Sequence, residues 1–166
     1  MRLIFLIVLL GTLRVEAKVE RDSVVVYAFL STICPMCIAY TPVLNQIAAE
    51  FGAKQVKVVG VFPNFYTSDS LVNLYRKEQP IDFEVIIDRD LALTNKFGAT
   101  LTPEVFVVSN NQVLYQGLID DSYFRPGKRR GKTSKHYLKT ALNVIVHNQK
   151  PSLSYTQSIG CAIVKN

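Results

Sequence analysis

Two of the chain's three cysteines, Cys34 and Cys37, are separated only by Pro35 and Met36. A disulfide between residues this close would close a very short loop and would constrain the unfolded chain little, so reactivity explains the spacing better than structural stapling does. In thiol–disulfide exchange, a thiolate attacks a disulfide sulfur and forms a mixed disulfide. The motif Cys34-Pro35-Met36-Cys37 therefore predicts this chemistry.

The elements around the pair assign a different role to each cysteine. The β-branched run Ser23–Leu30 predicts a buried strand, and helical spacing of apolar residues follows from Cys37 to Phe51. A thiol at the start of a helix is stabilised as thiolate, with a pKa lowered to about 3.5–7.5 from roughly 8.5. We expect Cys34 to be the nucleophile and Cys37, one turn further on, to resolve the mixed disulfide.

The remaining segments predict an α/β domain with a mixed sheet. Parallel β-α-β crossovers come first and an antiparallel hairpin comes last, and in such sheets sites form beyond the carboxyl ends of strands. Gly52 is expected to cap the first helix in a left-handed conformation, Pro42 to kink it, and Thr133 or Ser134 to cap the last helix. The segment 68–70 is expected to cap the second helix, Gly98 to end the third, and the turn formers at 109–111 to connect the two strands of the hairpin. The predicted strands are 23–30, 55–62, 83–88, 104–108 and 112–117, and the predicted helices are 37–51, 68–79, 91–97 and 135–146.

Thr102-Pro103 lies just before the fourth predicted strand, about 65 residues after the cysteine pair. Here the sequence resembles the thioredoxin superfamily, which implies a three-layer α/β/α sandwich. The resemblance also implies that Pro103 follows a cis peptide bond beside the dithiol, and that the backbone at Thr102 pairs with substrate. Ala28 stands where thioredoxins bury an acid, which argues against a general thioredoxin.

A narrower resemblance covers nearly the whole chain after the leader. Five segments look like the exported, peroxiredoxin-like redoxin-domain family of bacteria: FLSTICP at 29–35, GVF at 60–62, TPEVFV at 102–107, LYQGLIDD at 114–121 and GCAI at 160–163. The resemblance implies an oxidoreductase that acts on exported protein thiols or disulfides, together with a membrane or exported electron donor or acceptor, and that needs no cofactor.

A thiol-dependent peroxidase with antioxidant activity is the first alternative. The peroxiredoxin pattern requires a proline where this chain has Tyr27, and an arginine near the strand where it has Pro103 and Glu104. Without that cation the peroxidatic thiolate lacks its stabilising charge, and an adjacent carboxylate raises a thiol pKa. Glu104 is expected either to relay a proton to the leaving thiolate or to face solvent at the start of its strand.

Metal binding is the second alternative. A zinc site needs four ligands, and beyond the pair the chain offers only Cys161, His136 and His147, none in a suitable spacing. A copper chaperone needs a histidine near the two cysteines, whereas both histidines fall at the last predicted helix. We therefore predict no metal site.

Cys161 is the odd thiol, and three roles remain open for it: a buried apolar residue, a third redox thiol folded back toward the site, or a link to another chain. Four residues at the end of the hairpin either line the approach to the site or pack at a loop exit: Asp120, Asp121, Tyr123 and Phe124.

The first residues have the pattern of a secretory signal peptide, with Arg2, an apolar run over 3–10 and small residues before a cleavage site after Ala17. We expect a leader at 1–17, a redoxin domain at 18–150, a tail at 151–166, and a periplasmic or otherwise exported protein without stable membrane insertion. An uncleaved anchor is the alternative. The chain's net charge of +6 is concentrated partly in the basic run 125–132, which is expected to be a solvated loop rather than a phosphate or lipid site, with no nucleic-acid motif beside it.

Overall fold

The computed structural model describes residues 23–63 and 68–165. The expected leader at 1–17 and its cleavage site lie outside the described residues. Within the described part of the chain, no helix is long and apolar enough to cross a membrane.

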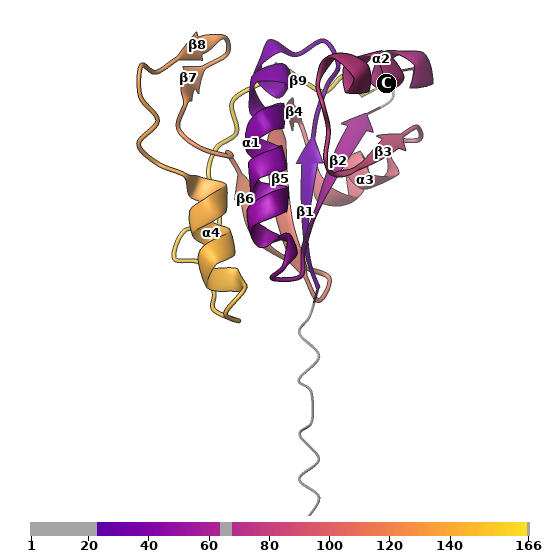
Figure 1. Ribbon diagram of the computed structural model, residues 1–166. Coiled ribbons are helices and arrows are strands. Elements are labelled where there is room, and N and C mark those ends of the chain that lie inside the picture. Colours follow the sequence, from indigo (N-terminus) through magenta and orange to yellow (C-terminus); the bar gives the residue numbers. More distant parts are fainter. Residues whose placement is uncertain (1–22, 64–67, 166) are drawn as a thin grey trace, which may run out of the picture.

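A five-stranded mixed sheet forms the centre of the molecule, in the order β3-β2-β1-β5-β6 (Figure 1). Its strands are β1 (Val24–Phe29), β2 (Val56–Pro63), β3 (Glu84–Asp88), β5 (Glu104–Ser109) and β6 (Gln112–Gly117). β1, β2 and β3 run parallel, whereas β5 is antiparallel to both β1 and β6. The expected α/β architecture with parallel crossovers first and a hairpin last is confirmed.

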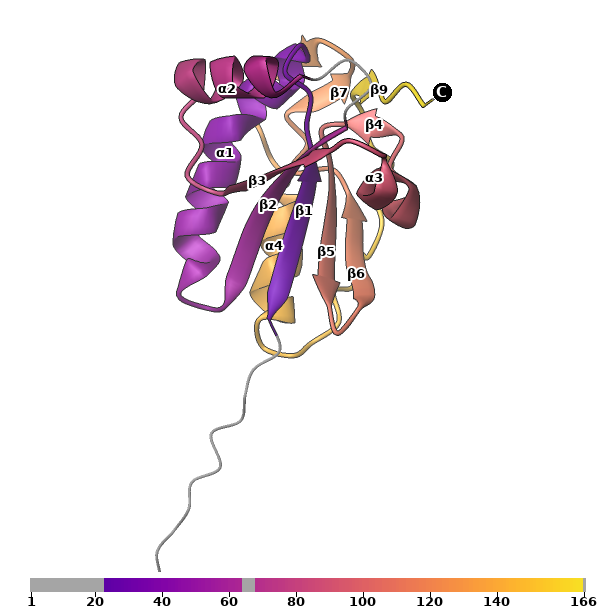
Figure 2. The ribbon, with the colours of Figure 1, turned by 90° about the vertical axis from the view of Figure 1, so that its right-hand side faces the viewer.

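Helices cover both faces of this sheet. Figures 1 and 2 show α1 (Pro35–Gly52) and α4 (Tyr137–Ile145) on one face and α3 (Ala92–Phe97) on the other, with α2 (Asp69–Glu78) at the upper end beside α1. Because successive strand residues point to opposite faces, β1 contributes Val24, Val26 and Ala28 to one core and Phe29 to the second. The result is three layers with two apolar cores.

The first helix contributes one face to the larger core, with Leu44 and Phe51 fully buried. It continues through Pro42 as an 18-residue helix, and the Thr41 hydroxyl donates to the carbonyl of Cys37 at 3.0 Å. The expected left-handed cap at Gly52 is wrong. Gly52 is the last helical residue, the chain continues in a right-handed turn, and the positive φ of 63° falls at Gln55 instead.

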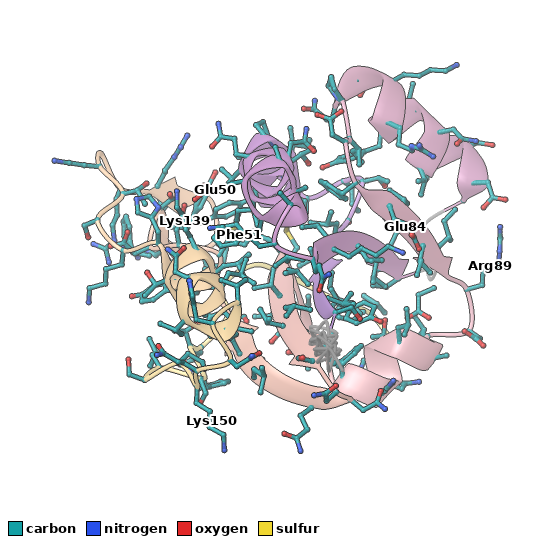
Figure 3. The ribbon with its side chains drawn as sticks, turned by 60° about the horizontal axis from the view of Figure 1, so that its bottom comes forward. Glu50, Phe51, Glu84, Arg89, Lys139 and Lys150 are labelled. Carbon is teal, nitrogen blue, oxygen red and sulfur yellow. A yellow bond between two sulfur atoms is a disulfide. The ribbon has the colours of Figure 1, made fainter. Side chains whose placement is uncertain are left out.

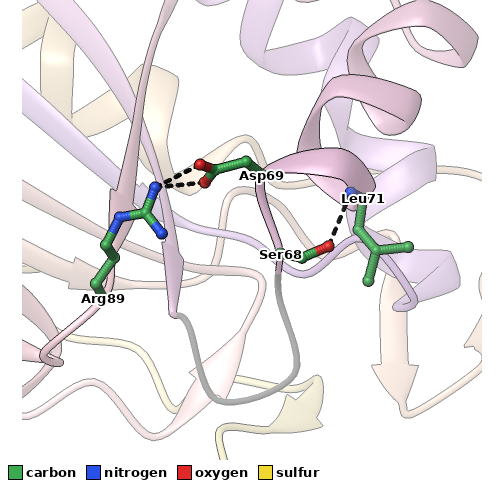
Figure 4. A network of polar contacts seen from close by, with 4 residues as sticks. All are labelled: Ser68, Asp69, Leu71 and Arg89. Carbon is green, nitrogen blue, oxygen red and sulfur yellow. Dashed lines mark hydrogen bonds and ion pairs between the residues drawn. The ribbon is translucent and has the colours of Figure 1, made fainter.

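Two further termini agree with the sequence. Ser68 caps α2 by accepting from the amide of Leu71 at 3.2 Å, and Asp69 pairs with Arg89 just beyond β3 (Figure 4). Gly98 ends α3 in the left-handed conformation that glycine adopts without steric cost.

The hairpin between β5 and β6 also has its expected turn. Its two turn residues, Asn110 and Asn111, both have positive φ, as a tight hairpin requires.

The expected cap of α4 is wrong. The helix begins at Tyr137, and its N-cap residue His136 makes no side-chain cap bond. Ser134 instead donates its amide and hydroxyl to Asp121, and the Thr133 hydroxyl lies 2.6 Å from that of Ser122. These hydroxyls therefore hold the loop that enters the helix.

The last helix also contacts the first at the surface. Lys139 reaches Glu50 of α1 at 2.7 Å, and Figure 3 shows the two side chains together. This ion pair is exposed and contributes little to stability.

Two small antiparallel pairs complete the fold. The basic run expected as a loop folds into a short exposed hairpin, β7 (Tyr123–Arg125) with β8 (Lys128–Arg129). The tail comes back to the body of the molecule, where β9 (Cys161–Ala162) pairs with β4 (Leu101–Thr102). Figures 1 and 2 place β9 beside β4 at the end of the sheet where α1 begins.

Candidate functional site

Cys34 lies at the point where the carboxyl end of β1 leads into α1. It is the N-cap residue of α1, Pro35 occupies the first turn, and the Cys34 side chain is fully buried. Proline is well suited to that position because the first-turn amides have no partner within the helix. Cys34 therefore stands at the positive end of the helix dipole, a position that in general favours the thiolate of a reduced cysteine.

The disulfide in the structure joins Cys34 to Cys161, which is 127 positions away, and Cys37 is a free thiol. The short ring between Cys34 and Cys37 that the spacing allows is therefore not the one present. Of the three roles open for Cys161, the placement agrees with a thiol folded back toward the site, and its redox role stays a prediction.

The Cys37 thiol is fully buried beneath this disulfide. Burial raises the pKa of Cys37 to about 12, while hydrogen bonds from the Ser31 amide and the Thr102 side chain act in the opposite direction. The amide nitrogen of Ser31 lies 3.3 Å from the Cys37 sulfur. Both sulfurs thus lie in the same core, and the two cysteines differ in that Cys34 is in a disulfide at the N-terminus of α1 whereas Cys37 is a free thiol within the helix.

Thr102 contacts both cysteines of the disulfide, Cys34 and Cys161. Its carbonyl oxygen lies 3.3 Å from the Cys34 sulfur, its hydroxyl donates to the carbonyl of Cys161 at 3.4 Å, and the peptide bond to Pro103 is cis. The cis bond agrees with what the resemblance implied. In the structure the backbone at Thr102 pairs with the chain's own tail, and its pairing with an external substrate stays a prediction.

Glu104 is buried, with 4% of its surface exposed, so the expectation that it faces solvent is wrong. Its carboxylate accepts from the Thr100 amide at 3.1 Å, from the Gln116 side chain at 3.3 Å and from the Ser158 hydroxyl at 3.0 Å. These contacts join the loop before β4, strand β6 and the tail. A proton relay by Glu104 stays a prediction, because none of these three partners is a cysteine.

A cavity of about 230 Å³ opens beside the disulfide. None of the described residues that line it carries a charged side chain, and its edge includes Ile33, which is 74% exposed. A peroxidatic site would place a cation here to stabilise the thiolate and polarise peroxide. The lining residues are Leu30, Ser31, Thr32, Ile33, Pro63, Thr102, Cys161, Ala162, Ile163 and Val164.

The two aspartates near the end of the hairpin organise the loop before α4. Asp120 accepts from the Tyr40 hydroxyl at 2.6 Å, and burial together with this contact raises the pKa of Tyr40 far above its ordinary value. Hydrogen bonds from Ser134 and Lys135 hold the pKa of Asp121 well below its usual range. These contacts favour the loop-exit explanation over a lining of the site.

The other two residues considered there lie on the exposed hairpin: Tyr123 packs on Tyr40, and Phe124 lies under the guanidinium groups of Arg125 and Arg130. Among the described residues, no group of three or more His, Cys, Asp or Glu side chains could hold a metal ion. His136 instead lines a separate cavity between α1 and α4.

Sequence reasoning missed three residues that shape the site. Ser31 supplies the amide that contacts Cys37, Ser158 ties the tail to Glu104, and Gly160 passes against the backbone of Thr102. A glycine directly before the odd cysteine was the one signal in the sequence that pointed to close backbone approach.

Comparisons with known proteins place this geometry in a family. The Redoxin family model matches residues 11–123, more than half of the chain, and Cys161 lies beyond the matched segment. A search of curated proteins finds no match.

Several solved structures share the fold. A hypothetical protein from Sinorhizobium meliloti is 24% identical with a TM-score of 0.73 (84% of this chain, 78% of that one), and an uncharacterised conserved protein from Geobacillus kaustophilus is 24% identical with a TM-score of 0.74 (87% and 78%). A Chlorobium tepidum protein provisionally assigned as the thiol:disulfide interchange protein DsbE is 27% identical with a TM-score of 0.53 (57% and 66%). From the family match and the shared fold, the chain belongs to the Redoxin family of the thioredoxin superfamily.

Proposed function

We propose that the protein is a thiol–disulfide oxidoreductase in which Cys34 is the exchanging sulfur. The observation that carries the proposal is the position of Cys34: its sulfur is at the N-terminus of α1, already in a disulfide, with the Cys37 thiol one helical turn away. The similarity to the Chlorobium tepidum protein assigned as a thiol:disulfide interchange protein supports the same activity.

Exchange would proceed in two steps. The Cys34 thiolate attacks a partner disulfide, forms a mixed disulfide and releases the partner's second sulfur as a thiolate, which takes up a proton. Cys37 then attacks the Cys34 sulfur, closes the Cys34–Cys37 disulfide and releases the partner's first sulfur. Two electrons have passed from the cysteine pair to the partner, and the reverse sequence would oxidise a partner dithiol.

The surroundings of the site favour a protein partner. Ile33 stands 74% exposed beside Cys34, and Val164 of the tail is 44% exposed at the same uncharged cavity. An apolar rim of this kind fits a polypeptide surface better than a small polar oxidant. Exported protein thiols or disulfides, with a membrane or exported electron donor or acceptor, are the partners we propose.

Export is the second part of the proposal. It is supported by the leader-like pattern at 1–17, with its apolar run and the small residue Ala17 at the expected cleavage site. Expression in a bacterium followed by intact-mass measurement of the periplasmic fraction tests it. A mature chain that starts at Lys18 is the expected product, and an uncleaved chain in the cytoplasmic fraction would contradict export.

A trapping experiment tests the exchange chemistry. Because Cys161 competes for Cys34, both variants carry Cys161→Ser, combined with either Cys37→Ser or Cys34→Ser. With insulin as the disulfide probe, the Cys37→Ser form should accumulate a covalent adduct through Cys34, visible by non-reducing electrophoresis and mass spectrometry. Equal adduct formation by both variants, or none by either, would overturn the proposal.

A further inference from the structure

The end of the chain lies against the site as an extended peptide. Thr102 pairs with Cys161 and Leu101 with Ala162 in antiparallel register, and the amide of Ile163 donates to the carbonyl of Thr100 at 2.8 Å. β9 is the only strand paired with β4 among the described residues. The tail therefore supplies the backbone hydrogen-bond partners of this short strand and brings Cys161 to Cys34.

A second set of contacts anchors the tail further upstream. Gln116 exchanges backbone hydrogen bonds of 2.9 Å with Ser154 and Thr156, and the Thr156 hydroxyl accepts from the Leu118 amide at 2.8 Å. Ser158 then bonds to the buried Glu104. From Thr156 to Cys161 is five residues, a reach of about 17 Å when extended, so a released Cys161 stays close to the site.

Gly160 of the tail lies directly against the backbone of β4 at Thr102. A Cβ at this position would overlap the carbonyl oxygen of Thr102 and lie 2.7 Å from its carbonyl carbon. Its φ is not in the left-handed region, so lack of space and not backbone conformation demands glycine here. A peptide that docks in this manner must therefore have glycine immediately before its cysteine.

The docked tail also closes the site. Cys34 and Cys37 are both fully buried in this state, whereas Cys161 is half-buried. We propose that residues 158–163 are an internal substrate of the cysteine pair, held on β4 through the Cys34–Cys161 disulfide and released when Cys37 attacks Cys34. This inference rests on the proposed thiol–disulfide exchange. It adds a gate, which is the docked tail that closes the site, and a preference for substrates with glycine before the reacting cysteine.

The releasing step needs no external oxidant or reductant. The Cys37 thiolate attacks the Cys34 sulfur, the Cys34–Cys37 bond forms, the Cys34–Cys161 bond breaks, and Cys161 leaves as a thiolate that is then protonated. One disulfide and one thiol are present before and after, so the step is an exchange between two isomers. In the second isomer the Cys34–Cys37 disulfide is formed and the edge of β4 is free. This isomer can therefore bind and react with another peptide that has glycine immediately before a cysteine.

Disulfide mapping by mass spectrometry, after acid quenching and thiol blocking, tests the gate without any activity assay. Cys37→Ser should leave only the Cys34–Cys161 bond. Gly160→Ala should raise the ratio of Cys34–Cys37 to Cys34–Cys161 by about tenfold, the effect of losing one backbone hydrogen bond in the docked tail. Gly131→Ala, at an exposed glycine with nothing within 4 Å of the added Cβ, is the matched control. A Gly160→Ala ratio equal to that of the wild type would overturn the gate.

A peptide assay tests the sequence preference. The probe is a synthetic peptide of residues 156–164, offered as a free thiol to the oxidised Cys161→Ser protein, in which it should form a mixed disulfide with Cys34 and release Cys37. The same peptide with alanine in place of glycine should react about tenfold more slowly, because it loses the backbone pairing with Thr102. Equal rates would overturn the preference.

The two proposals fail in distinguishable ways. If mapping shifts with Gly160→Ala but insulin forms no adduct, the gate stands and the exchange function falls. If the insulin adduct forms but Gly160→Ala leaves the ratio of the two disulfide isomers unchanged, the exchange function stands and the gate is wrong.

Discussion

The sulfur of Cys34 and the carbonyl oxygen of Thr102 lie 3.3 Å apart, although 68 positions separate the two residues in the chain. The sheet produces this proximity, because β1 ends in Cys34's loop while the antiparallel neighbour β5 begins just after Pro103. Any peptide that pairs with the backbone at Thr102 is thereby delivered to the Cys34 sulfur. In this structure that peptide is the chain's own tail.

The pKa of Cys37, raised by burial from 9.0 to about 12, gives a pH prediction for stability. The unfolded chain loses the Cys37 proton near pH 9 while the folded chain keeps it. The stabilising contribution is therefore complete below pH 9 and is lost as pH rises toward 12. We expect the urea midpoint of the wild type to fall between pH 9 and pH 12. When each protein is compared with its own midpoint at pH 7, the fall should be smaller in Cys37→Ala. An identical pH dependence in Cys37→Ala would contradict the buried-thiol assignment.

Tyr40 and Asp120 connect α1 to the loop before α4 through a hydrogen bond, and a substitution that removes only the Tyr40 hydroxyl tests it. Tyr40→Phe removes the 2.6 Å bond and leaves the Asp120 carboxylate with the Ser122 amide. The expected loss of unfolding free energy is about 1.5–3 kcal/mol, the range for hydrogen bonds to charged groups. Tyr155→Phe, at a tyrosine 57% exposed on the tail, should change stability by less than about 0.5 kcal/mol. Equal effects of the two substitutions in urea unfolding would argue against this contact.

Two substitutions distinguish a structural role of Glu104, as an anchor for the tail, from a role as a proton relay. Its three hydrogen bonds predict an anchor, so Glu104→Ala should lower the unfolding free energy by about 1–3 kcal/mol through the loss of the bonds that join Thr100, Gln116 and Ser158 to it. Glu104→Gln, which keeps an acceptor, should retain an exchange rate within about twofold of the wild type. A much larger loss in Glu104→Gln, with a shifted pH–rate profile, would show instead that the carboxylate relays protons.

The uncharged cavity beside Cys34 predicts slow reaction with peroxide. Stopped-flow measurement of hydrogen peroxide consumption by the reduced protein should give a rate no faster than free cysteine, since none of the described residues that line the cavity is a cation. Cys34→Ser provides the background. A rate far above free cysteine that depends on Cys34 would reverse the order of the two enzymatic functions.

Local signals in the sequence predicted most of the fold. The β-branched run of β1, the Ser68 cap, the Gly98 terminus and the Asn110-Asn111 turn are each determined by neighbours in the chain, and the structure confirms them. The failures came where tertiary contacts decided the outcome. Asp121 captures Ser134 and so removes it as a cap, and Glu104 is buried because distant Ser158 and Gln116 bond to it.

The site was predicted in part for the same reason. The hydrophobic pattern placed Cys34 and Cys37 at the turn from a strand into a helix, whereas Thr102 and Pro103 were placed beside them only by the resemblance to the thioredoxin superfamily. The partner of Cys34 was not predictable, because the tail has little periodicity and its docking depends on single backbone contacts at Gln116 and Thr102. Sequence spacing favoured Cys37, whereas the folded tail brings Cys161 to the same sulfur.

The most direct test of the central claim is the catalysed reduction of insulin disulfides by dithiothreitol, followed as turbidity, with the wild type and Cys34→Ser at equal concentration. We expect the wild type to shorten the lag and Cys34→Ser to match the uncatalysed reaction. Equal acceleration by both proteins would contradict the claim that Cys34 is the exchanging sulfur.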